Sequence, residues 1–86
     1  MTNSSVRIEI YSRPGCHLCD DAKEIVDRVR RRFPFSLRVI DIERDPELEK
    51  AYGEYIPVVL INGNEAFRYR IDEIEFETQV RTLWKT

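Results

Sequence analysis

The sequence predicts a small α/β domain whose strands and helices follow the order β-α-β-α-β-β-α. Three observations lead to this prediction: short apolar or alternating segments typical of strands, helical apolar spacing between them, and proline, glycine and asparagine at the boundaries. With 86 residues, the chain is expected to form one domain over residues 1–86. Residues 1–5 are polar and are expected to be a disordered arm.

Composition narrows the class of protein. The chain is 42% hydrophobic and 35% charged, which is typical of a soluble globular protein rather than a disordered one. A formal net charge of -2 gives no reason to expect nucleic acid or an anionic membrane as a partner. No apolar run approaches the roughly 20 residues that span a bilayer, and the N-terminus lacks an apolar signal core. We therefore expect a cytoplasmic monomer.

The first strand and helix are predicted from two different periodicities. Residues Val6–Tyr11 alternate, with Val6, Ile8 and Ile10 on one face of a strand. Pro14 and Gly15 mark a loop. The helix that follows has a buried stripe of Leu18, Ala22, Ile25, Val26, Val29 and Phe33. Pro34 ends this helix because proline cannot continue it.

The second strand is predicted over Ser36–Ile42. Leu37 and Val39, with Asp41, would lie on one face, and Ile40 and Ile42 on the other. A strand that is apolar on both faces is typical of a sheet covered on two sides. A short helix then begins with Asp45 as its N-cap and Pro46 at its first position, and Gly53 can close it.

The C-terminal third predicts a hairpin and a last helix. The run Ile56–Ile61 is the most hydrophobic and is expected to be the central strand. Asn62-Gly63-Asn64 is a hairpin turn signal, so Glu65–Arg70 should return antiparallel. Asp72 begins the last helix, and the apolar face of that helix is predicted to hold Phe76, Val80, Leu83 and Trp84.

The two cysteines of the chain, Cys16 and Cys19, stand at the predicted start of the first helix. Residues three apart share a helical face, so the two sulfurs can meet. A dithiol between a strand and a helix is the sequence context of a thiol-disulfide redox site. Cys16 falls at the helix N-terminus, which favours an anion, and is the predicted nucleophile. Cys19, one turn inside, is the predicted resolving thiol.

Other interpretations of the cysteine pair stay open from the residues alone. They are two incidental cysteines, a short structural disulfide, or a metal site. Zinc usually takes four ligands, and this region offers only Cys16, Cys19 and His17, although two chains can share a cluster. Nearby, Arg13 and His17 favour a Cys16 thiolate, whereas the carboxylates of residues 20 and 21 oppose it. Redox activity is favoured over these alternatives because the presence of Pro57, considered next, is consistent with a redox site.

Pro57 precedes a strongly apolar strand, where proline is disfavoured unless it begins the strand. A cis Ile56–Pro57 bond would turn the chain and leave the adjacent backbone free to pair with a bound peptide or thiol. Cis bonds make up only about 5–6% of X-Pro bonds, so this prediction depends on a family resemblance. Tyr55 and Tyr69 are expected to pack in the core or to line a substrate groove.

Three segments carry that resemblance: Tyr-Ser-Arg-x-x-Cys-x-Leu-Cys over Tyr11–Cys19, Asp-x-x-x-Asp-Pro over Asp41–Pro46, and Ile-Pro-Val over Ile56–Val58. Together they resemble the glutaredoxin-like proteins of the thioredoxin superfamily, and the short bacterial members above all. The likeness extends over roughly residues 6–84. It implies a thioredoxin-like, four-stranded mixed sheet of order 2-1-3-4 flanked by helices, with a cis proline beside the dithiol.

The resemblance also implies an activity, that of a thiol-disulfide oxidoreductase acting on protein or glutathione mixed disulfides. Its partners would be a disulfide-containing protein or a low-molecular-weight thiol. Arg13 matches the position that contacts a glutathione carboxylate, Ile56 the backbone that pairs with the cysteinyl part, and Pro57 the cis proline. His17 is an exposed candidate at the same substrate site. No bound cofactor is expected.

Glutathione remains a candidate co-substrate only. Glutathione-using relatives carry Gly-Gly-x-Asp after the hairpin, whereas this chain has bulky residues over Phe67–Ile71 before Asp72. Two further functions stay open: a binding or regulatory module that does not turn over, and a metal or iron–sulfur carrier.

Overall fold

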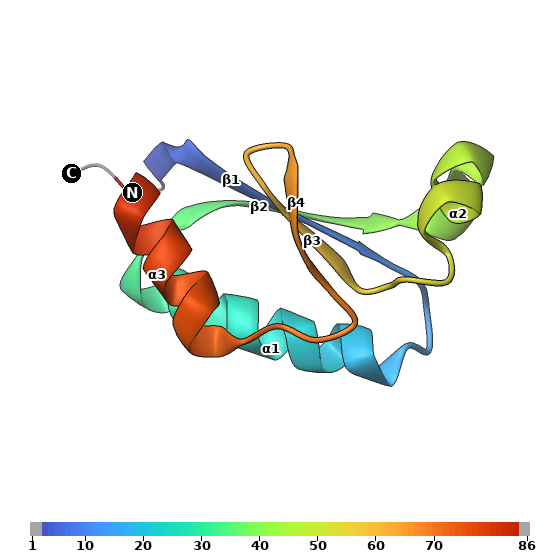
Figure 1. Ribbon diagram of the computed structural model, residues 1–86, viewed down its shortest axis with the longest axis horizontal. Coiled ribbons are helices and arrows are strands. Elements are labelled where there is room, and N and C mark those ends of the chain that lie inside the picture. The colour runs from blue at the N-terminus through green and yellow to red at the C-terminus, as the bar shows by residue number, and fades with distance from the viewer. Residues whose placement is uncertain (1–2, 85–86) are drawn as a thin grey trace.

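The computed structural model describes residues 3–84 and shows the predicted order of elements (Figure 1). A single sheet is flanked by helices. The elements are β1 (Asn3–Ser12), α1 (His17–Arg32), β2 (Phe35–Asp41), the 3₁₀ helix η1 (Ile42–Arg44), α2 (Pro46–Tyr52), β3 (Val58–Ile61), β4 (Asn64–Arg68) and α3 (Glu73–Leu83).

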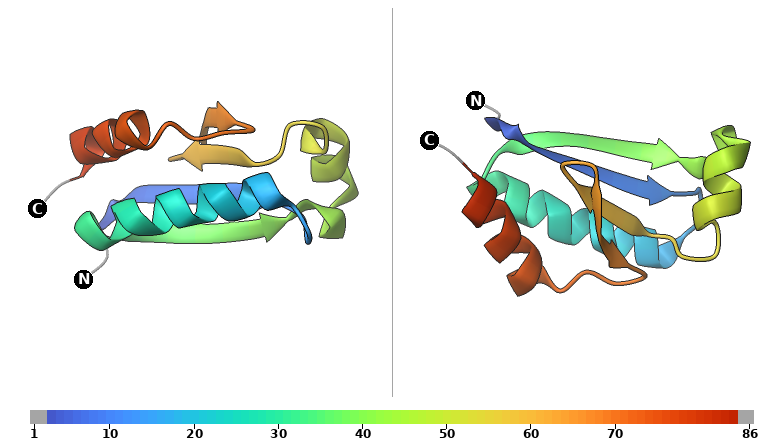
Figure 2. Two further views of the ribbon diagram at one scale, coloured as in Figure 1. Left: turned by 90° about the horizontal axis from the view of Figure 1, so that it is seen from below. Right: turned by 45° about the horizontal axis from the view of Figure 1, so that its top comes forward.

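The sheet has four strands in the order β2-β1-β3-β4, as the family resemblance implies. β1 pairs in parallel with β2, and β3 pairs antiparallel with both β1 and β4. β3 is therefore interior, and all four of its residues are buried, which confirms it as a central strand. Helices α1 and α3 lie on the same face of the sheet, and α2 lies beyond the end where β2 finishes (Figures 1 and 2).

The core lies between this helical layer and the sheet. Side chains of β1, α1, β2, β3 and α3 meet there. The predicted strand face is buried, and three of the six residues of the predicted helical stripe are buried while the other three are partly buried. The buried cluster includes Val6, Ile8, Ile10, Ala22, Val26, Val29, Phe35, Val59, Phe76 and Val80. Phe35 and Phe76 pack edge to face with ring centroids 6.1 Å apart. This burial stabilises the layered arrangement because it removes apolar area from water.

The first strand begins earlier than the sequence predicts. β1 starts at Asn3, so the expected arm does not extend over residues 3–5, and Met1 and Thr2 lie outside the described residues. The polar start of the strand has partners from distant segments. Asn3 pairs with Phe35, and the side chain of Asn62 donates to the Ser5 carbonyl at 3.0 Å. Long-range pairing of this kind leaves no local pattern in a sequence.

β2 has the predicted length but lies one residue earlier in the chain, and it is more exposed than predicted. It ends at Asp41, whose side chain accepts from the Glu43 backbone at 2.9 Å and so caps η1, which begins at Ile42. β2 is an edge strand with β1 as its one neighbour, and α1 and α3 both lie on the same face of the sheet (Figure 2). Val39 is 47% exposed, so the expectation that both faces of this strand are buried is wrong.

The last hairpin and helix follow the prediction with small shifts. Asn62 and Gly63 form the turn with φ of 52° and 84°. The Asp72 side chain accepts from the Glu75 backbone at 3.0 Å and caps α3. Trp84 follows the helix and donates from Nε1 to the Pro34 carbonyl at 3.0 Å. Leu83 is 37% exposed and lies outside the apolar face predicted for it. No helix within residues 3–84 is long and apolar enough to cross a membrane.

Candidate active site

The two cysteines form a disulfide at the N-terminus of α1, with their Cα atoms 5.2 Å apart. Cys16 is the N-cap residue, and its Sγ accepts a hydrogen bond from the Cys19 backbone N–H at 3.2 Å. The loop from β1 turns at Gly15, where φ is 77°. The strand–loop–helix context predicted for the dithiol is therefore present.

The two sulfurs differ in their environment. Cys19 is fully buried at 0% exposure, whereas Cys16 is partly exposed and His17 is exposed. The Cys16 Sγ also lies where backbone N–H groups and the helix dipole favour negative charge. The Cys16 sulfur is therefore accessible at a position that stabilises an anion, whereas the Cys19 sulfur is shielded from solvent.

Pro57 lies at the same end of the sheet as the disulfide. The Ile56–Pro57 bond is cis, as the family resemblance implies, and Pro57 is fully buried while Ile56 is partly buried. Val58 pairs with Tyr11, so Pro57 follows in register at the end of β1 that leads into the cysteine loop. The antiparallel pairing of β1 with β3 therefore brings the two motifs together.

Arg13 joins the cysteine loop to α2. Its Nη2 donates to the Gly53 carbonyl at 3.1 Å, and its buried Nε has no hydrogen-bond partner within the described residues. Gly53 caps the C-terminus of α2, where the helix dipole favours a cation. Arg13 thus has a structural contact that the sequence does not reveal. Its contact with a glutathione carboxylate stays a prediction.

Residues after β4 form a wall beside the cis proline. The backbone N–H of Tyr69, at φ 66°, lies 2.9 Å from the Pro57 carbonyl and 3.3 Å from the Tyr55 carbonyl and donates to both. The Tyr55 and Tyr69 rings pack edge to face, with centroids 6.2 Å apart, and the Arg68 guanidinium lies 4.4 Å from the Tyr55 ring centroid. These contacts hold the segment after β4 against the cis-proline loop.

A pocket of about 340 Å³ opens between α1 and this segment. It is lined by Leu18, Asp21, Ala22, Glu24, Ile25, Arg28, Tyr69, Arg70 and Ile71. Leu18 stands between the two cysteines, so the pocket borders the redox site. The sequence left core packing and a groove position both open for Tyr69, and it did not predict the pocket, because the two walls are about fifty residues apart in the chain.

Burial raises the pKa of Tyr11, and the nearby carboxylate of Glu9 adds to the effect. The Tyr11 ring packs against Tyr52 with centroids 4.8 Å apart. The ring contact indicates a packing role for Tyr11 at the end of β1. Within residues 3–84, no three His, Cys, Asp or Glu side chains are placed to hold a metal ion together.

Comparison with known proteins matches the chain to one family of domains. Residues 7–81 match the model of the glutaredoxin-like domain family (DUF836). A glutaredoxin-like protein of Dictyostelium discoideum is 37% identical, over 92% of this chain and 79% of its own. A thioredoxin of Methanocaldococcus jannaschii is 33% identical, over 74% of this chain and 79% of its own.

The solved structures give the same result for the fold. A structural-genomics target protein from X. campestris superposes with a TM-score of 0.73 at 27% identity, and the match covers 87% of this chain and 96% of that one. The chain therefore belongs to the glutaredoxin-like domain family of the thioredoxin superfamily.

Proposed function

We propose that this protein is a dithiol–disulfide oxidoreductase that reduces protein disulfides or mixed disulfides with low-molecular-weight thiols. The observation that carries the proposal is the Cys16–Cys19 disulfide at the start of α1, with one sulfur partly exposed and the other buried. A structural disulfide closing so short a loop would restrict the unfolded chain little, so stabilisation is a weak reason for it.

The proposed reaction begins with both cysteines reduced. The Cys16 thiolate attacks one sulfur of the substrate disulfide, and the other substrate sulfur leaves and takes a proton from solvent. Cys19 then loses its proton and attacks Cys16 Sγ in the mixed disulfide, which releases the second substrate thiol. Two electrons pass from the protein to the substrate, and a thiol or dithiol reductant must return them.

Glutathione is the proposed low-molecular-weight partner to test first. Arg13 would contact a carboxylate, and the backbone of Ile56 before the cis Pro57 would pair with the cysteinyl part. Tyr69 and Arg70, both exposed, stand near this site where glutathione-using relatives carry glycines. An NMR titration following the amides of Arg13, Ile56 and Asp72 tests the idea. No perturbation at millimolar glutathione would leave a thioredoxin-type protein reductant.

The activity itself is tested by insulin reduction, with Cys16→Ser as the comparison. We expect the variant to lose the activity, and full retention would overturn the proposal.

A measured redox potential of roughly -200 to -270 mV would fit a cytosolic reductant of this fold rather than a module that does not turn over. Absorbance typical of an iron–sulfur cluster in the purified protein would instead favour a carrier. A role as a reductant is consistent with a cytoplasmic location. One chain supplies every residue of the proposed site, so the proposed active form is a monomer.

A further inference from the structure

We propose that the pocket between α1 and residues 69–71, here called the α1 pocket, selects disulfide substrates that carry a lysine or arginine beside the reacting cysteine. This inference rests on the proposed function, because it assigns a substrate class to the same redox site. The α1 pocket is made of the lining residues described above and has a volume of about 340 Å³, which suits one long side chain.

The position of the pocket makes it reachable from the redox site. Leu18, Asp21, Ala22, Ile25 and Arg28 recur at helical spacing and form one stripe of α1, which begins between the two cysteines. With a rise of about 1.5 Å per residue, Asp21 lies roughly 7–8 Å along the axis from Cys16. A substrate residue adjacent to the reacting cysteine can therefore extend its side chain to the pocket.

The opposite wall is held in place. Tyr69 donates its backbone N–H to the Pro57 carbonyl at 2.9 Å, and Ile71 is 8% exposed and belongs to the core cluster. Both walls are therefore anchored to the motifs that make up the redox site. The pocket borders the dithiol through Leu18, which lines the pocket and stands between the two cysteines in the chain.

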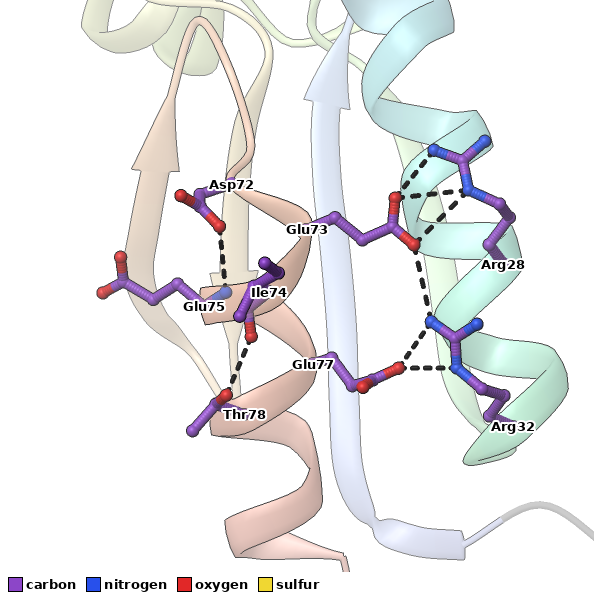
Figure 3. A network of polar contacts seen from close by, with 8 residues as sticks. All are labelled: Arg28, Arg32, Asp72, Glu73, Ile74, Glu75, Glu77 and Thr78. Carbon is purple, nitrogen blue, oxygen red and sulfur yellow. Dashed lines mark hydrogen bonds and ion pairs between the residues drawn. The ribbon is translucent and has the colours of Figure 1, made fainter.

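Charge selects the occupant. Arg28, one of two guanidinium groups in the pocket, is already paired with Glu73 at 2.8 Å (Figure 3). Asp21 and Glu24 form no ion pair within residues 3–84, and the same holds for Arg70 on the other wall. Asp21 is therefore a carboxylate without an ion pair on α1, whereas Glu24 interacts electrostatically with Arg28, whose main partner is Glu73. The Arg70 guanidinium on the other wall can bind a backbone carbonyl of the substrate.

A basic side chain also matches the apolar part of the pocket. Leu18 and Ile25 are partly buried and lie on the same stripe as Asp21. Lysine and arginine cover apolar surface with their methylene stems while the charged head stays in contact with water or a carboxylate. A stem over Leu18 and Ile25 would place the head near Asp21 and Glu24. An acidic side chain would meet the same two carboxylates and be repelled.

The test compares single-turnover rates on three peptides of one design. Each is a short capped peptide whose cysteine forms a mixed disulfide with uncharged thiopyridine, and the neighbouring residue is lysine, norleucine or glutamate. The fully reduced protein is mixed with each peptide, and release of thiopyridone is followed by stopped flow. No external reductant is needed because the protein supplies both electrons. We expect lysine to exceed norleucine by about three- to tenfold, and norleucine to exceed glutamate.

A matched pair of double variants isolates the pocket from the general charge of the helix. Asp21→Asn with Glu24→Gln removes the two lining carboxylates. Asp20→Asn with Asp27→Asn removes two exposed carboxylates of the same helix that do not line the pocket. The first variant should reduce the lysine preference to about twofold or less, and the second should keep most of it. Uncharged 2-hydroxyethyl disulfide reports any change in Cys16 reactivity common to all substrates.

The outcomes separate this proposal from the proposed function. Equal rates on the three peptides, or equal loss of preference in both variants, would overturn the assignment of the α1 pocket while the oxidoreductase activity stands. No reaction of the reduced protein with any peptide or with 2-hydroxyethyl disulfide would overturn the oxidoreductase activity itself. Circular dichroism before each measurement confirms that the double variants are folded.

Discussion

Arg13 and Gly53 are joined by a hydrogen bond of 3.1 Å from the Arg13 Nη2 to the Gly53 carbonyl. This contact links the loop that carries the redox cysteines to the C-terminus of α2, forty positions further along the chain. Close packing around residue 53 also restricts that position to glycine. A Cβ added there would lie 2.6 Å from the Glu49 carbonyl oxygen and 3.0 Å from the Arg13 Nη2.

Gly53→Ala is therefore expected to destabilise the fold by about 1–3 kcal/mol, because the crowded atoms include a backbone carbonyl that cannot move cheaply. Urea unfolding of the variant and the parent protein measures the difference. Glu54→Ala, at the exposed neighbouring position, is the control and should lie within about 0.5 kcal/mol of the parent. Equal stability of Gly53→Ala and the parent would show that the α2 terminus adapts freely.

Arg13→Gln is expected to lower stability by about 0.5–1.5 kcal/mol, because it removes the hydrogen bond that joins the loop to α2. Arg44→Gln serves as the matched control. The Arg44 side chain is 88% exposed and is paired with Asp41 at a distance of 4.0 Å, so its loss should cost little. Chemical denaturation of both variants measures the two changes in stability. A loss in Arg13→Gln no larger than that in Arg44→Gln would contradict a structural role for Arg13.

Glu73 links α3 to α1 through Arg28 and Arg32 (Figure 3). The hydrogen bond from Arg28 lowers the pKa of Glu73 below its ordinary value of 4.5. A carboxyl group whose pKa is lower in the folded state stabilises that state above its unfolded pKa, and the effect is lost as pH falls through the folded pKa. The contribution is therefore present at pH 7 and disappears in acid.

Glu73→Gln should consequently be less stable than the parent near neutral pH, and the difference should shrink as the pH falls well below 4.5. Thermal unfolding across this range provides the measurement, and added salt should also reduce the difference. Glu75→Gln is the control, because the Glu75 side chain has no ion pair within residues 3–84. A difference that is independent of pH would mean that the network acts by packing alone.

Phe35→Ala is expected to cost about 3–5 kcal/mol, because the side chain is fully buried and packs against Phe76 in the core between sheet and helices. Ile74→Ala, at a position 81% exposed on α3, should change stability by less than about 0.5 kcal/mol. Calorimetry of the two variants gives both values. Similar losses of stability in the two variants would contradict the location of the core between the sheet and the helices.

The sequence predicts most of the fold because its local signals agree with one another. The alternation around Ile8, the helical spacing around Val26 and the Asp45–Pro46 helix start each depend on neighbouring residues, and each is confirmed. Family resemblance supplied the strand order and the cis bond before Pro57. Neither could be inferred from periodicity, because both depend on how distant segments pair.

The features that sequence reasoning missed depend on long-range contacts. Asn62 orders the start of β1 across more than fifty positions, and the exposure of Val39 follows from the edge position of β2. The partner of Arg13 and the walls of the α1 pocket are likewise far apart in the chain. The cysteine pair was predictable because a single helical turn holds both sulfurs.

Trapping of the mixed disulfide tests the central claim most directly. Reduced Cys19→Ser is mixed with a peptide disulfide and its intact mass is measured under denaturing, non-reducing conditions. Cys16→Ser is treated in the same way. The proposed roles predict that Cys19→Ser accumulates a covalent adduct of one peptide on Cys16, because no resolving thiol remains, and that Cys16→Ser forms little or none. Preferential adduct formation by Cys16→Ser, on the buried Cys19, would contradict the assignment of Cys16 as the nucleophile.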